Sequence, residues 1–176
     1  MRKRTFERGQ RVVHDEDLLL AVLNSAPMVR GQRTEGLVGS AGEELARFFG
    51  GSGAEDELQH LQRTRDALHG VLRKEYDALG RLDSAIVQAQ LMPEVSFTGI
   101  QWNVHVQEDY QLGVRAMMAW SAVMQELPGR LRECANSECN LFLIDHSRPG
   151  TAKWCSMATC GNRMKARSHA NRQREG

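Results

Sequence analysis

The four cysteines of this 176-residue chain lie between residues 134 and 160, and their spacing constrains the fold more than any other feature. They form two pairs, Cys134 with Cys139 and Cys155 with Cys160, with four residues inside each pair and 15 between the pairs. Two close pairs joined by one segment are typical of a four-thiolate metal site, usually a zinc site. Because four thiolates complete a tetrahedral shell, we expect one structural Zn²⁺ ion and no catalytic water.

The histidines near these cysteines are not needed as ligands. His146 and His169 could each offer a nitrogen, but four cysteines complete the shell, so we expect both at the surface. The alternative to a metal site is a set of unrelated buried cysteines, which their clustering disfavours. A module this small has too little apolar core to fold alone, and the metal would supply the missing stability.

Charge is distributed unevenly along the chain, although the net charge is only +1. Residues 130–176 contain nine Lys and Arg side chains and four acidic ones, whereas residues 1–129 contain 14 and 18. A basic end on a mildly acidic body suits contact with a polyanion such as DNA. On charge alone, a solvated tail explains the same pattern equally well.

Apolar residues make up 41% and charged residues 26% of the chain, which is typical of a soluble globular protein. The longest early apolar run, residues 18–23, is too short for a signal peptide or a membrane span. We therefore expect a cytoplasmic protein without a membrane partner. Thiols stay reduced in the cytoplasm, so this location favours metal binding over disulfides.

The cysteine-free body is predicted to be mainly helical. Apolar residues recur at helical spacing in residues 58–72, 81–91 and 112–127. Ser52 and Glu55 are typical of a capping box that opens the first of these helices. An earlier short helix is expected to begin at Asp15, after a loose segment of residues 1–14.

The periodicity changes after Pro93, which is expected to end a helix. From Ile100 to Val106 apolar residues alternate with polar ones, which indicates a half-buried strand. Val95 and Phe97 alternate in the opposite phase, so a turn or bulge is expected near residues 98–99. These residues therefore predict a β-hairpin packed against the helices.

Pro128 and Gly129 mark the predicted boundary between two domains, residues 1–129 and 130–176. Beyond it, residues 141–144 are typical of a strand and residues 161–167 of a helix. A cysteine knuckle, a hairpin and a helix with ligands at its start follow a treble-clef-like plan. The predicted fold class is therefore α+β: a mainly helical N-terminal domain with a short β-hairpin, plus a small C-terminal treble-clef-like zinc module.

The segment CSMATCGNRMKA, residues 155–166, resembles the signature of the CGNR zinc-finger family, named for residues 160–163. Upstream elements match as well: Arg130, Arg132, Cys134, Cys139, residues 142–145, Ser147, Arg148 and Trp154. The resemblance implies that Cys134, Cys139, Cys155 and Cys160 bind the zinc ion. The family pattern is richer in arginine before Trp154 than residues 151–153 are here, which weakens a nucleic-acid surface at that point.

Members of this family usually carry an N-terminal ABATE domain, which is predicted to sense a ligand. Residues 18–25 look like the opening of that domain. The family is described as stress-induced transcription regulators with a DNA-binding finger. The resemblance therefore implies an ABATE-like, ligand-sensing body at residues 1–129, a small-molecule effector and DNA as a partner.

A basic helix after the last cysteine is the candidate nucleic-acid surface. The candidate contacts are Arg148, Lys153, Arg163, Lys165, Arg167 and Arg172. Arg and Lys bound to phosphates supply affinity without sequence choice, whereas base reading would need groups such as Asn162 or Asn171. For Gly161 and Asn162 we favour a structural role in turning the backbone at the metal.

Two other functions compete with DNA-binding regulation. The zinc module could instead dock a protein partner, which would make the chain a zinc-dependent adaptor without direct DNA binding. Enzymatic activity is not expected, because the body lacks a nucleophile elbow, a phosphate-binding glycine loop and a His/carboxylate metal cluster. A homodimer would double the contacts of one weakly binding finger, with Met117, Met118 and the helix 112–127 as candidate dimer surface.

Overall fold

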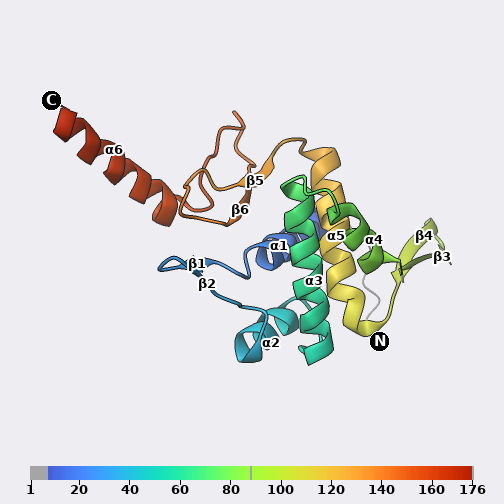
Figure 1. Ribbon diagram of the computed structural model, residues 1–176. Coiled ribbons are helices and arrows are strands. Elements are labelled where there is room, and N and C mark those ends of the chain that lie inside the picture. Colours follow the sequence, from blue (N-terminus) through green and yellow to red (C-terminus); the bar gives the residue numbers. More distant parts are fainter. Residues whose placement is uncertain (1–7, 88, 176) are drawn as a thin grey trace.

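The computed structural model describes residues 8–87 and 89–175 and combines helices with three separate two-stranded hairpins (Figure 1). The helices are α1 (Arg8–Leu23), α2 (Gly39–Phe48), α3 (Glu55–Leu72), α4 (Ala78–Ile86), η1 (Glu108–Tyr110), α5 (Gln111–Glu126), η2 (Met157–Gly161) and α6 (Asn162–Glu175). The strands are β1 (Met28–Val29), β2 (Gln32–Arg33), β3 (Gln90–Ser96), β4 (Gly99–His105), β5 (Leu131–Glu133) and β6 (Phe142–Ile144). This mixture of helices and small hairpin sheets agrees with the predicted class. In the part of the chain described, no helix is both long and apolar enough to span a bilayer.

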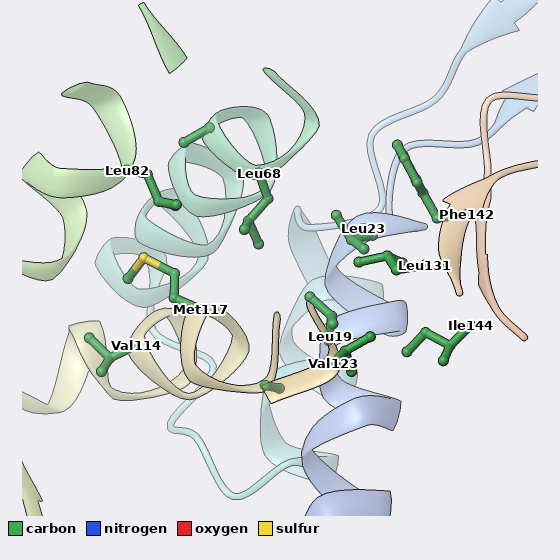
Figure 2. Close-up of a cluster of buried hydrophobic side chains, with 12 residues drawn as sticks. Leu19, Leu23, Leu68, Leu82, Val114, Met117, Val123, Leu131, Phe142 and Ile144 are labelled. Atoms are coloured by element: carbon green, nitrogen blue, oxygen red, sulfur yellow. The ribbon is translucent and has the colours of Figure 1, made fainter. Parts of the chain in front are cut away.

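Helices α1, α3 and α5 pack together and enclose the core of the body (Figure 2). Leu19 and Leu23 of α1 meet Leu68 of α3 and Val123 of α5 in one cluster of buried side chains. A second cluster, formed with α2, takes the other face of α1. Helix α1 is therefore buried on two sides, which explains why its apolar residues come in adjacent pairs rather than singly.

The β5–β6 hairpin of the C-terminal segment packs into this same core. Leu131, Phe142 and Ile144 are buried beside Leu19 and Leu23, as Figure 2 shows. The side chain of Asn24 joins the two parts: its amide donates to the Phe142 carbonyl at 3.1 Å, and its oxygen accepts from the Phe142 amide at 2.7 Å. The domain boundary at residues 129–130 stays a prediction. Residues on both sides of it contribute to the same hydrophobic core.

Two expected helix starts differ from those observed. Helix α1 begins at Arg8, within the segment expected to be loose, and residues 1–7 lie outside the described residues. The expected capping box is wrong, because Ala54 is the N-cap of α3 and Glu57 holds the position assigned to Glu55. Glu57 reaches back to accept from the Gly53 amide at 2.7 Å and from the Ser52 hydroxyl at 3.0 Å.

The β3–β4 hairpin forms with a turn at residues 97–98, as the alternation predicts. The expectation that a helix runs to residue 91 is wrong, because α4 ends at Ile86 and Pro93 lies inside β3. A two-stranded sheet accommodates a proline whose missing N–H faces outward. The expected packing against the helices is also wrong for most of the hairpin, since Ile100 and Trp102 are exposed.

A buried arginine fixes the inner face of α3. Arg65 is only 2% exposed and donates to Glu35 at 2.7 Å, to Asp66 at 3.0 Å and to the Ser25 hydroxyl at 3.1 Å. Burial opposes ionisation of Glu35, but the hydrogen bond and charge of Arg65 outweigh it and hold the pKa of that carboxyl below its usual value. Arg65 therefore ties α3 to the segment after α1 and is not available to a ligand.

Candidate metal centre

The four cysteines converge at one point of the C-terminal segment. Cys134 and Cys139 lie in the loop between β5 and β6. Cys155 lies just before η2, a single π-helical turn that leads into α6, and Cys160 lies within that turn. Their sulfur atoms all lie within 4.8 Å of one another, and none is in a disulfide. The structure therefore brings together all four predicted ligands.

The sulfur geometry fits a tetrahedral zinc ion. Zinc–sulfur bonds of about 2.3 Å in a tetrahedron place neighbouring sulfur atoms about 3.8 Å apart. The Cys155 sulfur lies 3.7 Å from that of Cys139 and 3.7 Å from that of Cys160. These distances are too long for disulfides and leave room for one cation between the sulfur atoms.

Electrostatics also call for a cation at this point. Burial and the neighbouring sulfur atoms raise the pKa of the Cys155 thiol far above its ordinary value. Burial, the Cys160 hydrogen bond and the Cys134 charge likewise raise the pKa of Cys139, although the hydrogen bonds with Leu141 and Cys155 oppose them. Four thiolates cannot coexist here unless a positive ion offsets their charge, and a divalent metal supplies that charge.

Asn136 supports the cluster, although it was not among the predicted site residues. Its side chain is fully buried and donates to the Cys160 sulfur at 3.4 Å. Burial opposes ionisation of Cys160, but this hydrogen bond and the neighbouring sulfur atoms outweigh it and lower the pKa of that thiol. The Cys155 amide also donates to the Cys134 sulfur at 3.4 Å. Such donors to sulfur stabilise the thiolate form that a metal requires.

Gly161 lies in a closely packed position, where a larger residue would displace neighbouring side chains. A Cβ atom added there would lie 2.8 Å from the Met157 sulfur and 3.2 Å from the Trp154 ring. Its amide donates to the Ser156 carbonyl at 3.0 Å, and the Asn162 side chain donates to the Ala158 carbonyl at 3.3 Å. Both residues therefore shape the π-helical turn.

Asp145 connects β6 to the loop that leads back to the cysteines. Its carboxylate is almost inaccessible to solvent and accepts from the Arg132 guanidinium, from the Ser147 amide at 2.9 Å and from the Ala152 amide at 3.0 Å. The bonds from Ser147 and Ala152 and the charge of Arg132 hold the pKa of Asp145 below its usual value, against the effect of burial. This network fixes the approach of residues 152–154 to Cys155.

The predicted basic contacts occupy three places. Arg148 lies in the loop after β6, Lys153 lies two residues before Cys155, and the other four lie on α6: Arg163, Lys165, Arg167 and Arg172. All six are exposed. Arg167, however, donates to both oxygens of Glu138 at 2.6 Å, so part of its charge is already offset within the chain.

A cleft of about 740 Å³ separates the start of α6 from the β1–β2 hairpin. Arg163 and Glu138 line one side, and Arg30 and Gly31 of the hairpin turn line the other. The Asn140 side chain holds the hairpin there, accepting from the Met28 amide at 2.8 Å and donating to the Ala26 carbonyl at 2.7 Å. Arg30 was not among the predicted contacts, because the sequence around it shows no helix or strand periodicity.

Comparison with known families supports the metal centre. Residues 130–173 match the family model described as CGNR zinc finger. No curated protein matches the chain. The matched residues include all four clustered cysteines. The family match and the cysteine cluster together indicate a zinc-binding segment. It does not extend into the body, where the ABATE resemblance stays a prediction.

Proposed function

We propose that the chain is a DNA-binding transcriptional regulator in which the zinc centre holds α6 against the duplex. The observation that carries the proposal is the placement of α6, which projects away from the rest of the molecule (Figure 1). Its sequence contains five cations and one acid, and its described side chains are exposed except for the half-buried Met164. A helix of this kind has almost no apolar face to bury within the chain.

The positive charge on α6 favours contact with a polyanion over exposure to solvent. Arg163 and Arg167 are four residues apart on one face, where like charges repel. Phosphates between them would remove this repulsion and release condensed counterions. The helix is roughly 21 Å long by its rise of about 1.5 Å per residue, and a major groove of about 12 Å width accepts a helix.

The cleft beside α6 adds a second contact surface to the proposal. Arg30 on the β1–β2 turn and Arg163 on α6 face the same space, so a phosphate backbone entering it would meet cations from both sides. Glu138 in the same cleft repels phosphates and engages Arg167. Binding of DNA would therefore exchange the Glu138–Arg167 pair for Arg–phosphate contacts.

The proposal predicts that the chain binds DNA in a salt-dependent way. It also predicts that two substitutions change the affinity for DNA in opposite directions. Fluorescence anisotropy of the zinc-loaded chain on mixed-sequence duplex DNA should show affinity that falls linearly with the logarithm of salt. Arg163→Ala should weaken binding and reduce that slope by about 1, because one phosphate contact is lost. Glu138→Gln should tighten binding, because it frees Arg167 and removes a negative charge beside the phosphates.

Arg47→Ala is the matched control, because this exposed arginine of α2 pairs with Glu43, and α2 lies apart from α6 (Figure 1). Its affinity for DNA should equal that of the unmodified chain. If the zinc-loaded chain does not bind duplex DNA at low salt, the regulator proposal fails. The adaptor function, in which the zinc module docks a protein, would then take its place.

For the body we propose a response to a small anionic effector rather than catalysis. A cavity of about 180 Å³ lies between α3, α4 and η1, lined by His60, Arg63, Arg81 and Tyr110 among others. The rings of His60 and Tyr110 are 3.7 Å apart, and the arginines favour a carboxylate. Titration with short-chain carboxylates should shift the His60 ring signals in NMR spectra, and Arg63→Ala should abolish the shift. Unchanged spectra would exclude this cavity as the effector site.

A further inference from the structure

The β3–β4 hairpin has one apolar face. Residues paired directly across an antiparallel sheet share a face, and the register pairs Leu91 with Val104, Pro93 with Trp102 and Val95 with Ile100. All of these side chains are apolar. The opposite face carries the pair formed by residues 92 and 103 and the pair formed by residues 94 and 101. Most of these four side chains are polar. Such alternation is typical of a sheet with one buried face.

Most of that apolar face is uncovered within the chain. Val95 is 81% exposed, Ile100 63% and Trp102 61%, while Phe97 at the turn is fully exposed. Of the apolar face, only Val104 near the base packs against the core. An isolated two-stranded hairpin is marginally stable in water at best, so a face of this kind is expected to be covered.

A second apolar surface lies on the neighbouring helices. A groove of about 690 Å³ runs between α4 and α5, lined among others by Leu79, Ile86, Met118 and Trp120. Leu79 is 67% exposed and Met118 44% exposed. Asp83 is the one charged residue among those that line the groove in the described part of the chain. Depletion of charge is typical of the centre of a protein–protein interface.

We propose that a second copy of this chain covers both surfaces, with the hairpin face of each copy packed into the α4–α5 groove of the other. Because each copy gives its hairpin to the groove of the other, the two contacts are related by a two-fold axis, and the assembly closes as a dimer. Phe97 and Trp102 each supply on the order of 150–250 Å² of apolar area. Together with the rest of the face and groove, they reach the roughly 800 Å² per partner of a stable interface.

The hairpin edge argues for face-to-groove packing rather than edge-to-edge pairing. Pro93 lies opposite Trp102, and Ser96 opposite Gly99 closes a two-residue turn. Counting from that turn, residue 93 is in a non-hydrogen-bonded pair, so its missing N–H faces away from β4. The outer edge of β3 therefore lacks a donor in its middle, which disfavours addition of another strand there.

The test compares two lysine substitutions on adjacent residues of β4. Sedimentation equilibrium of the zinc-loaded full chain without DNA, from nanomolar to high micromolar concentration, should show a monomer–dimer equilibrium. Ile100→Lys, on the apolar face, should raise the dissociation constant at least about 100-fold, because it buries a charge in the interface. Gln101→Lys, on the polar face, should leave it unchanged. A wild-type chain that stays monomeric, or equal dissociation constants for the two variants, would overturn the proposal.

A second measurement assigns the contact surface. A photoreactive benzophenone at position 97, in a mixture of isotopically heavy and light chains, should cross-link copies to one another within residues 79–86 or 117–121. Cross-links confined to one copy, or to another surface of the second copy, would overturn the groove assignment. Because neither measurement contains DNA, failure of the dimer proposal is separate from failure of the DNA-binding proposal.

Discussion

Cys155→Ser is expected to abolish stable metal binding and to unfold the loops around the cysteine cluster. Cys155 lies 3.7 Å from the sulfur atoms of both Cys139 and Cys160, so its loss removes the donor that joins them. Zinc supplies about 10–16 kcal/mol to small modules of this kind, which is more than their own core provides. The purified wild-type chain should contain one zinc ion, and the variant should lose its metal to a mild chelator.

Metal content by mass spectrometry and a change in tryptophan fluorescence measure this effect, because Trp154, one of three tryptophans, lies against the turn at Gly161. Ser137→Ala is the matched control: it changes an exposed residue inside the first cysteine pair and should keep the metal. A Cys155→Ser chain that retains zinc against the chelator would show that this cysteine is not a ligand. The body should stay folded in both variants, since its core consists mainly of residues from α1, α3 and α5.

Phe142→Ala is expected to have the second largest effect, a decrease of about 3–5 kcal/mol in the free energy of unfolding. Phe142 is 1% exposed and packs in the core of the body, with its ring 4.9 Å from that of His69. The substitution leaves a cavity where the C-terminal segment joins the body, so we also expect the β5–β6 hairpin to detach. Urea denaturation of the zinc-loaded chain measures the loss, and metal content should stay at one ion.

Leu141→Ala serves as the comparison, because Leu141 precedes Phe142 in the chain but is only half-buried. Its cost should be clearly smaller than that of Phe142→Ala. Equal costs for the two substitutions would indicate that residues 1–129 and 130–176 fold independently, as the predicted boundary implies. A larger cost at Phe142 would show that the two parts form one cooperative unit.

The metal cluster was predictable because its ligands are close together in the sequence. A short, turn-forming spacing such as that from Cys134 to Cys139 brings two sulfur atoms together almost regardless of the rest of the fold. The strand at residues 100–106 and the turn before it were predictable for a similar reason, since the period-two alternation and the turn are local, whereas the start of β3 at Gln90 was not. The capping residue of α3 was missed because a shift of two residues in the helix start moves the cap from Glu55 to Glu57.

Contacts between distant residues were not predictable. Asn24 meets Phe142, Arg167 meets Glu138, and Arg30 faces Arg163 across a cleft. Each contact depends on how whole elements pack, and neither residue of such a pair is marked by its neighbours in the sequence. The core that residues on both sides of the 129–130 boundary share could not be predicted for the same reason. An apolar strand such as residues 142–144 does not specify which surface it packs against.

The sequence by itself determined that one end of this protein builds a four-cysteine centre and that the alternating residues 100–106 form one strand of a hairpin, because ligand spacing and side-chain alternation act over a few residues. Only the tertiary structure decided where these features lie. It packed Phe142 into the body core, left α6 projecting with the cations at 163, 165, 167 and 172 exposed, and placed Ile100 and Trp102 at the surface. The physical reason is that a pattern specifies that a face needs burial, whereas the packing of all elements together decides what buries it.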